Sequence, residues 1–520
     1  MWPARGFWAF GALALAAAVL ITRGLTGAPG YTDAFYHFNA AVRLTSGLGL
    51  TDAYLWTYIG APDALPSSGV FPSHLYWMPL TSIMAALGMA IFNAPGSYAA
   101  AQVPLALMYA ATALVGFALG WRLGGTARHA WIAGLLTIFS GFFVRYWGAT
   151  DTFAPYALIG SLTLQALAHG VERGGWRWFA LSGVLTGLAH LTRADGLLLL
   201  IVGALVIAWP KPQRTLRARG AALVALLAAY GVVMLPWFAR NLSVVGTPLP
   251  LGGTAAIWFT QYNDLFNYPP EASPAALLAD GGMALLASRW EALSNNLATF
   301  VAVEGLIAMT PLMLIGLWLR RRSPFLRPFW LYALGLHLAM TLIFPFPGYR
   351  GGLFHSAAAL VPWWAALGVV GLDDAVDWLA RHRRWRAQSA KVVFSAALVI
   401  LAVSLSVFTG LSGRVPAELS IPALYAEVDS LLPDGARIMI NDPAQFAYYT
   451  GRGGVVLPNA DPSVLAEIAE RYSVDYLLLE ADGAGYALPA RLAPIIDAPP
   501  EFLRPVPLEH ADARLYVIRR

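Results

Sequence analysis

The chain has no cysteine and little charge. None of its 520 residues is Cys, which excludes disulfides and thiolate metal sites. Only 12% of the residues are Asp, Glu, Lys or Arg, about half the share of a soluble domain. The P-loop motif of nucleotide-driven motors is also absent. The net charge of +5 is modest, and we expect no nucleic-acid partner.

Apolar residues, in contrast, make up 58% of the chain, and the mean hydropathy is +0.59. These values are typical of a polytopic membrane protein. The predicted fold class is an all-α membrane bundle with a small C-terminal α/β domain. About eleven transmembrane helices are predicted from the lengths of the apolar stretches. They lie near residues 7–26, 98–121, 129–147, 152–170, 176–192, 194–210, 217–238, 297–319, 326–345, 353–371 and 390–410.

A further apolar run, 78–93, sets the orientation of every later helix. If it lies on the outer surface as an interfacial helix, the cytoplasmic loops hold 18 of the 34 Lys and Arg residues and the outer loops hold seven. If it crossed the bilayer, every basic cluster would lie outside, against the positive-inside rule. We therefore predict a multi-pass protein of the cytoplasmic (inner) cell membrane, with its N-terminus in the cytoplasm and its C-terminus outside.

Three long segments then face outward. Two are loops, 27–97 and 239–296, within a transmembrane domain predicted to span residues 1–414. The third is the tail, 415–520, where strand patterns alternate with a helix pattern, at 436–440, 463–472, 475–480 and 513–518. The tail is predicted to form a small extracytoplasmic α/β domain without a catalytic constellation of its own.

The first outer loop places three polar groups on one helical face. Asp33, Tyr36 and His37 are spaced i, i+3 and i+4 in a helix expected to begin at Thr32 or Asp33 and to end near Gly47. Asp33 could act as a general base on an acceptor hydroxyl or amine, or as a ligand of a divalent cation. In the alternative interpretation Asp33 caps the helix, worth about 1 kcal/mol, and Tyr36 and His37 anchor the interface.

Three further polar residues are candidates on the same side. Asp151 opens a predicted span and is either a second functional carboxylate or an N-cap before Pro155. His74 precedes the interfacial run among aromatic residues, where packed histidines are more common than ligands. Glu304 lies one or two turns inside a predicted span, and an ionisable group there is by default a functional candidate.

A phosphate-binding segment is predicted around Arg350. This arginine precedes Gly351 and Gly352, and His355 follows in the same segment. A guanidinium beside open backbone amides suits a phosphate, although an arginine paired with lipid headgroups is the alternative. Arg240 is a weaker candidate of the same kind, and Asp195 is expected to pair locally with Arg193.

Taken together, these motifs resemble those of the GT-C glycosyltransferases, polytopic enzymes that use polyprenyl-phosphate-linked sugars. The likeness is greatest to bacterial relatives of protein O-mannosyltransferases and lipid A aminoarabinose transferases. It covers nearly the whole chain and rests on Asp33, Pro79-Leu80, Asp151, residues 191–197 (LTRADGL), residues 235–241 (LPWFARN) with Gly246-Thr247-Pro248, and residues 448–452 (YYTGR).

The resemblance implies sugar transfer, hexosyl or pentosyl, from a polyprenyl-phosphate donor to a lipid, glycan or protein acceptor at the outer face, with inversion. It implies that Asp33 is the base or acceptor-positioning group, that Asp151 has a supporting acidic role, and that Arg350 holds the donor phosphate. The further predicted substrate-binding residues are His355, Arg240, Tyr36, His37, His74 and Glu304. If a divalent cation is used, Asp33 and Asp151 are its expected ligands.

Two departures and two alternatives accompany this hypothesis. Ala34 stands where the mannosyltransferases carry a second acidic residue, and Trp363-Trp364 is followed by Ala365 rather than by the aspartate of oligosaccharyltransferases. A transporter or flippase of lipid-linked glycans is the rival class, but it would place ionisable groups near mid-membrane, often in repeated halves, and no repeat is found. A non-catalytic GT-C-like protein is the third possibility.

Overall fold

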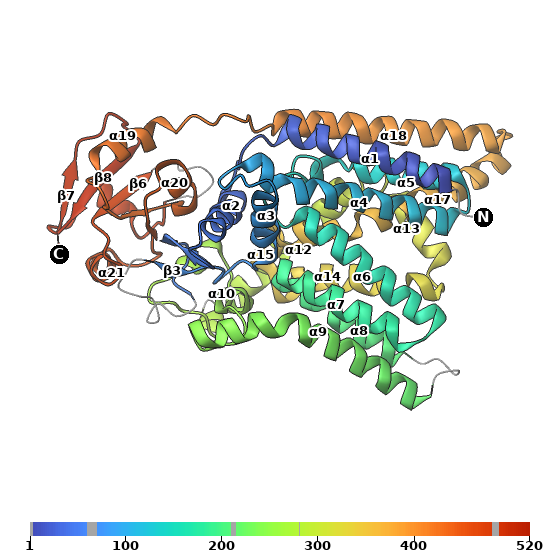
Figure 1. Ribbon diagram of the computed structural model, residues 1–520, viewed down its shortest axis with the longest axis horizontal. Coiled ribbons are helices and arrows are strands. Elements are labelled where there is room, and N and C mark those ends of the chain that lie inside the picture. The colour runs from blue at the N-terminus through green and yellow to red at the C-terminus, as the bar shows by residue number, and fades with distance from the viewer. Residues whose placement is uncertain (1–3, 60–69, 210–214, 280, 481–487, 520) are drawn as a thin grey trace.

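The structure is a computed structural model, and it describes residues 4–59, 70–209, 215–279, 281–480 and 488–519. A bundle of helices forms one part of the molecule, and the C-terminal segment forms the other (Figure 1). The N-terminus and the turn between the last two long helices lie at the end of the bundle that is remote from this segment (Figure 1). The C-terminal segment and the N-terminus therefore lie at opposite ends of the bundle (Figure 1).

The bundle is built from apolar helices. Six helical stretches among the described residues are long and apolar enough to cross a membrane: Arg5–Leu25, Tyr98–Gly124, Leu216–Val245, Pro324–Ile343, Pro345–Arg383 and Ala387–Ser412. The longer helices are α1 (Ala4–Leu25), α4 (Tyr98–Gly124), α5 (Ala127–Ile138), α6 (Phe153–Arg173), α7 (Trp176–Thr192), α8 (Leu197–Ala208), α9 (Leu216–Val245), α12 (Gly281–Thr299), α13 (Thr310–Arg320), α14 (Arg327–Leu338), α17 (Val361–Arg383) and α18 (Ala387–Ser412).

Two predicted spans are interrupted in the structure. The apolar stretch at 297–319 is not one helix, because α12 continues through a π-helical turn (Phe300–Glu304) and the chain then breaks before α13. Leu306 and Ile307 have φ of 45° and 65° at this break, a left-handed conformation that ends a right-handed helix. The stretch at 129–147 is also shorter than predicted, since α5 ends at Ile138. Both stretches are apolar, and hydropathy therefore predicted continuous spans; it carries no information on where the backbone leaves the helical conformation.

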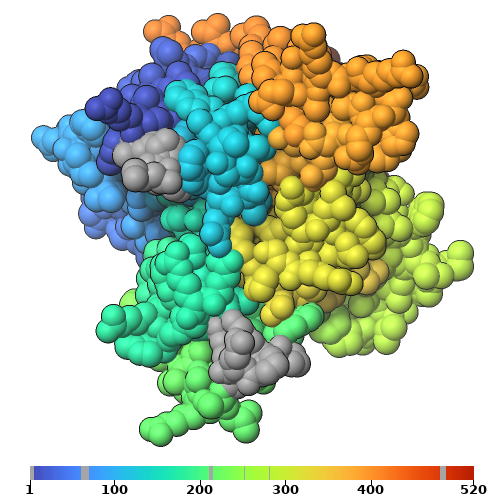
Figure 2. All heavy atoms as spheres, turned by 90° about the vertical axis from the view of Figure 1, so that its right-hand side faces the viewer, coloured from blue at the N-terminus to red at the C-terminus, as the bar shows by residue number. Residues whose placement is uncertain are grey.

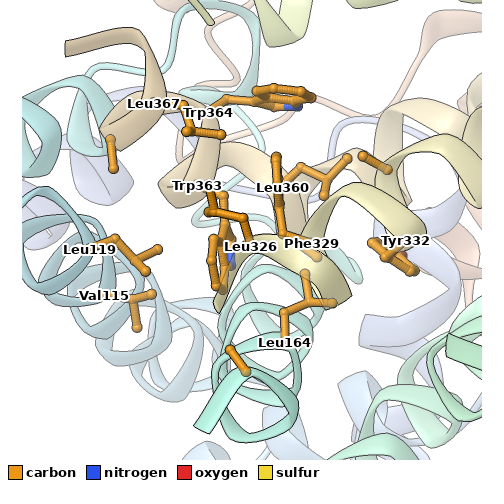
Figure 3. Close-up of a cluster of buried hydrophobic side chains, with 14 of the residues drawn as sticks. Val115, Leu119, Leu164, Leu326, Phe329, Tyr332, Leu360, Trp363, Trp364 and Leu367 are labelled. Atoms are coloured by element: carbon orange, nitrogen blue, oxygen red, sulfur yellow. The ribbon is translucent and has the colours of Figure 1, made fainter. Parts of the chain in front are cut away.

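The bundle core is aromatic and lies between distant helices (Figure 3). Trp363 of α17 is fully buried and stacks on Phe329 of α14, with ring centroids 5.3 Å apart. Leu119 of α4 and Leu164 of α6 belong to the same cluster. In a membrane the alternative to burial is lipid, so this core is held by close van der Waals packing between side chains rather than by their removal from water. This packing fixes α4, α6, α14 and α17 against one another, and α6 and α17 are the helices that continue from the candidate site.

The predicted first outer loop folds as two short helices and a small β-structure. Helix α2 (Thr32–Thr45) ends near Gly47, as predicted: Ser46 is its C-cap, and Gly47 follows with φ of 77°. Strands β1 (Thr51–Asp52) and β3 (Phe71–Pro72) pair antiparallel. Helix α3 (Leu80–Ile91) has 12 residues and is about 18 Å long, too short to cross a bilayer. It packs against α2 and α4.

The C-terminal segment contains a six-stranded mixed sheet in the order β2-β5-β4-β6-β8-β7. Its strands are β4 (Ile438–Ile440), β5 (Gly454–Val456), β6 (Tyr476–Glu480), β7 (Leu503–Val506) and β8 (Ala513–Ile518), joined by β2 (Tyr54–Leu55) from the first outer loop. Its helices include α19 (Ala423–Leu431), α20 (Pro443–Thr450) and α21 (Leu465–Tyr472). The strand patterns predicted for the tail correspond to β4, β6 and β8, whereas β2 was not foreseen.

The remaining short helices are α10 (Leu251–Ala255), α11 (Pro274–Ala279), α15 (Pro345–Pro347) and α16 (Leu353–Ala357). Figure 2 shows the end of the bundle remote from the C-terminal segment, where the region around α13 (yellow) lies beside α17 and α18 (orange). Helices α13 and α17 terminate in Arg320 and Arg383. Basic residues thus close both helices at this end of the bundle.

Candidate active site

Three side chains that are far apart in the sequence converge between the bundle and the first outer loop. Asp33 is the second residue of α2, Asp151 lies just before α6, and His355 lies in α16. One potential ligand atom from each lies within 4.8 Å of the other two. Two of these residues were predicted as catalytic and the third as substrate-binding, and the structure brings all three together.

His355 joins the two carboxylates. Its Nε2 atom lies 3.1 Å from Asp151 Oδ2 and 3.8 Å from Asp33 Oδ2. Its Nδ1 atom lies 2.8 Å from the carbonyl oxygen of Gly351, which assigns the Nδ1 proton to that carbonyl. Gly351 has φ of 129°, a conformation that favours glycine. The imidazole therefore presents Nε2 to both acids.

Asp33 and Asp151 are held differently. Asp33 accepts a hydrogen bond of 2.7 Å from Trp77 Nε1, and its side chain is 30% exposed. Asp151 is 1% exposed and accepts hydrogen bonds from the Tyr31 hydroxyl at 2.8 Å and from the Thr152 backbone N–H. No side-chain hydrogen bond caps α2, so the predicted cap role of Asp33 has no support here. Asp33 is the accessible member of the pair and Asp151 the buried one.

The two carboxylates also differ in acidity. Burial and the nearby Asp151 carboxylate raise the pKa of Asp33 to about 6. Burial opposes ionisation of Asp151 as well, but pairing with His355 outweighs it and holds the pKa of Asp151 below its usual range. A general base works best when its pKa lies near the working pH. Asp33 therefore has the exposure and the basicity of a base, and Asp151 is a fixed charge beside it.

The same three residues have the donor chemistry of a divalent-cation site. Two carboxylates and an imidazole are ligands that transition metals accept once the imidazole gives up its Nε2 proton, and the hydrogen bond from His355 Nδ1 to a backbone carbonyl is the outer contact that metal-binding histidines usually make. The structure thus adds His355 to Asp33 and Asp151, the two acidic ligands predicted from the sequence. The residues fit a divalent cation by donor type and by mutual distance.

Arg193 is a neighbour of the site that the sequence analysis treated only as a local partner. It pairs with Asp195 at 3.0 Å, as predicted, but its guanidinium also donates to Ser356 Oγ at 2.9 Å and to Thr152 Oγ1 at 3.4 Å. It therefore links the segments that carry Asp151 and His355. The only sequence signal for this role was a charged pair at the end of an apolar helix, and that signal does not name distant partners.

Tyr36, His37 and His74 form a buried network behind Asp33. Tyr36 stacks on Trp77 with centroids 4.1 Å apart and donates to Asp52 Oδ2 at 2.9 Å. The rings of His37 and His74 both contact Ser82 Oγ, at 2.8 Å and 3.0 Å. Burial lowers the pKa of His37 to about 4, which keeps its ring neutral. This network holds Trp77, and through it the Asp33 carboxylate.

The other three predicted residues have no interaction with the cluster in the described part of the chain. Arg240 donates to the carbonyl oxygens of Ser73 at 2.9 Å and Leu50 at 3.1 Å, and so braces the first loop. Glu304 is buried in the bundle beside His337 at 3.0 Å and accepts from Trp364 Nε1 at 2.8 Å. Arg350 is exposed and lies over the Tyr262 ring, 4.7 Å from its centroid.

Comparison with known proteins gives a match in the first half of the chain. Residues 77–237 match the family model described as dolichyl-phosphate-mannose-protein mannosyltransferase. That range contains Asp151 and Arg193, whereas Asp33 and His355 lie outside it. None of the curated proteins matches the sequence.

Solved structures match over a longer range. ArnT from Cupriavidus metallidurans, bound to undecaprenyl phosphate, has a TM-score of 0.56 at 13% identity, covering 98% of this chain and 97% of ArnT. The oligosaccharyltransferase of Archaeoglobus fulgidus, in complex with Zn and sulfate, has a TM-score of 0.55 at 14% identity, covering 90% of this chain and 67% of that one. The likeness at these identities concerns the fold. This chain has the fold of the GT-C superfamily of membrane glycosyltransferases, as the sequence motifs predicted.

Proposed function

We propose that this protein is a membrane glycosyltransferase that transfers a hexosyl or pentosyl group from a polyprenyl-phosphate donor to an acceptor at the outer face of the membrane. The observation that carries the proposal is the cluster of Asp33, Asp151 and His355, in which a partly exposed carboxylate of raised pKa lies beside a buried charged one. The fold supports it, since ArnT was solved with undecaprenyl phosphate and AglB, another structural match, with a dolichol-phosphate.

In this proposal Asp33 removes the proton from the acceptor hydroxyl or amine. The acceptor atom then forms its bond to the anomeric carbon, while the bond from that carbon to the phosphate oxygen breaks. The bonding electrons leave with the polyprenyl phosphate, and the proton stays on Asp33 until solvent takes it. A single displacement of this kind inverts the anomeric centre. Asp151 and Arg193 keep His355 oriented toward Asp33.

Arg350 is proposed to bind the donor phosphate. Its guanidinium is exposed, is steadied by the Tyr262 ring, and precedes His355 by five residues in the same segment. Few basic residues occupy the predicted outer side, so an exposed arginine next to two glycines there is unusual. A fork-shaped donor can contact two phosphate oxygens and offset the charge that develops as the phosphate leaves.

Replacing Arg350 with Ala is expected to weaken donor binding about 10- to 100-fold, because hydrogen bonds to a charged group contribute about 1.5–3 kcal/mol. Acceptor KM should remain within about twofold, a negligible free-energy change. Titration of the purified protein with a polyprenyl-phosphate sugar measures the donor Kd. Arg350→Lys is the matched variant, and it should recover part of the affinity because it keeps the charge but not the fork. Unchanged donor affinity in Arg350→Ala would remove this role.

A divalent cation is the proposed cofactor, with Asp33, Asp151 and His355 as the residues that would hold it. When bound, such an ion would supply positive charge beside the donor phosphate. The related oligosaccharyltransferase was solved with Zn and sulfate. Chelation of the purified protein tests this: activity lost and restored by one divalent ion would support the cofactor, and activity unaffected by chelation would exclude it.

We further propose the topology and division predicted from the sequence. The protein would have about eleven spans in the cell membrane, with the N-terminus in the cytoplasm, a transmembrane domain of residues 1–414 and an extracytoplasmic domain of residues 415–520. Two observations support this: α3 is too short to cross, and the N-terminus lies at the end of the bundle remote from the C-terminal segment (Figure 1).

Mass spectrometry of glycans and lipid-linked sugars, in cells with and without the gene, tests the proposed function as a whole. We expect one polyprenyl-phosphate sugar to accumulate without the gene, together with an acceptor that lacks that sugar. The identity of the accumulated lipid names the donor, and the unmodified molecule names the acceptor. Accumulation of the lipid-linked glycan in the inner leaflet alone would instead indicate a flippase.

A further inference from the structure

The first outer loop and the C-terminal segment share one sheet. Strand β2 of the loop pairs parallel with β5 of the segment, with Tyr54 opposite Gly454 and Leu55 opposite Val455. The hydroxyl of Tyr58, also in the loop, donates to the Val456 carbonyl at 2.5 Å. An edge strand supplied by a distant part of the chain ties the two parts through backbone hydrogen bonds. The C-terminal segment therefore touches the same loop that carries Asp33.

Helix α2 of that loop also packs directly on α20 of the C-terminal segment. Phe35 contacts the rings of Tyr448 and Tyr449, with centroids 4.9 Å and 5.9 Å apart. Asn39 donates from Nδ2 to the Ala444 carbonyl oxygen at 2.9 Å. Phe35 and Asn39 lie within two turns of Asp33 on the same helix. The position of α2 is therefore set partly by α20.

One carboxylate joins the two helices at their first turns. Asp442 is 5% exposed, and its Oδ1 atom accepts from the backbone N–H groups of Ala444 and Gln445, both at 3.1 Å, which caps α20. Its Oδ2 atom accepts from Thr32 Oγ1 at 2.6 Å. Thr32 is the first residue of α2 and directly precedes Asp33. A buried carboxyl group thus bonds to the residue next to the proposed base.

Three successive residues at the start of α2 are attached to three different segments. Tyr31 donates to Asp151 in the bundle, Thr32 donates to Asp442 in the C-terminal segment, and Asp33 accepts from Trp77 in the loop. Among the described residues, the Asp33 carboxylate accepts one hydrogen bond, from Trp77, and its side chain is 30% exposed, so its place depends on the backbone before it. Misplacement of a reacting group by 1 Å can cost about 10²-fold in rate.

We propose that the C-terminal segment positions the active site, and that Asp442 is a positioning residue that acts through the Thr32 hydroxyl to fix Asp33. This inference rests on the proposed function of Asp33 as the base. It assigns to the C-terminal segment a part in catalysis without any contact with substrate. The buried hydrogen bond between Thr32 and Asp442 is the specific link, whereas the sheet and the aromatic contacts dock the segment as a whole.

Thr32→Val tests this link, because valine keeps the shape of threonine and removes the hydroxyl. We expect kcat to fall about 10- to 100-fold with donor KM unchanged, since binding groups are not displaced. Thr32→Ser, which restores a hydroxyl, should recover most of kcat. Tyr58→Phe is the matched control: it removes a buried hydrogen bond between the same loop and the same segment, away from Asp33. It should leave kcat within about twofold, within the scatter of such measurements.

Amide hydrogen exchange over residues 31–37 separates failure of this inference from failure of the proposed function. Thr32→Val should exchange faster than wild type in this stretch, while Tyr58→Phe should not. Unchanged exchange, or unchanged kcat in an active enzyme, would overturn the positioning role. If Thr32→Val exchanges faster but the wild-type protein itself transfers no sugar, the proposed function is refuted, whereas the structural link between Thr32 and Asp442 stands. Thr32→Ala serves as a second variant if valine does not fold.

Discussion

Replacing Asp33 with Asn is expected to lower the rate of sugar transfer by about 10²- to 10⁴-fold, the usual contribution of a general base. Asparagine keeps the oxygen that accepts from Trp77 but cannot take a proton at neutral pH. The assay measures polyprenyl phosphate released from a lipid-linked sugar donor at saturating acceptor. Donor Kd measured with a chelator present, so that no cation contributes, should not change, because Arg350 is the proposed phosphate ligand. Full activity in this variant would remove Asp33 from the mechanism.

The same variant should be more stable than wild type above pH 6. Asp33 has a folded-state pKa raised from 3.8 to about 6, so its ionised form is disfavoured in the folded protein. The contribution of this pKa shift to the free energy of unfolding is fully present below pH 4, and it is lost as the pH rises to about 6. Because the side chain is partly exposed, we expect a gain of about 1–2 kcal/mol for Asp33→Asn at pH 8.

That gain should vanish at pH 4, where aspartic acid is already neutral in the wild-type protein. Thermal unfolding in detergent, with a chelator present, measures the difference between the two pH values. A residue whose loss removes activity and adds stability is characteristic of an active site rather than of a structural contact. Equal melting temperatures for variant and wild type at pH 8 would show that the folded protein does not disfavour the ionised form of Asp33.

Replacing Asp151 with Asn is expected to have the opposite effect on stability. The pKa of Asp151 is lowered, so its ionised form stabilises the fold above pH 4 and this contribution is lost as the pH falls through the lower folded value. Removing one partner of a buried ion pair costs about 3–5 kcal/mol. We therefore expect Asp151→Asn to melt at a lower temperature than wild type at pH 7, in the same measurement.

Activity of Asp151→Asn should also fall, by about 10- to 100-fold, because His355 loses the carboxylate that orients it toward Asp33. The purified variant is assayed at a temperature 20 °C below its own melting temperature, so that unfolding does not contribute to the loss of activity. The double variant with Asp33→Asn should be no less active than Asp33→Asn alone. Independent, multiplicative losses would show that the two acids do not act as one unit.

Local patterns in the sequence predicted a large part of this protein. The i, i+3, i+4 spacing of Asp33, Tyr36 and His37 lies on α2, which has the predicted beginning and end. The run at 78–93 contains α3, whose 12 residues are too few to cross a bilayer. These features depend on residues within one or two turns of each other, and such short-range order is encoded by hydropathy, helix propensity and turn residues.

Other features escaped prediction because they depend on distant partners. Arg193 looked like half of a local ion pair, yet it also contacts Thr152 and Ser356. His74 and Arg240 were candidates for substrate binding, yet their observed contacts are with Ser82 and with loop carbonyls. Strand β2 has two residues, too few for a periodic signal, and it exists because β5 offers it an edge.

The sequence by itself determined the membrane class of the chain, its apolar helices and the identity of the two carboxylates of the candidate site. Only the tertiary structure decided that Asp33 and Asp151 share one site with His355, 204 residues from Asp151, and that they acquire opposite shifts in acidity there. The physical reason is that a pKa follows from burial and from charges a few ångströms away. Those neighbours are set by the packing of α2, α6 and α16, which no local pattern records.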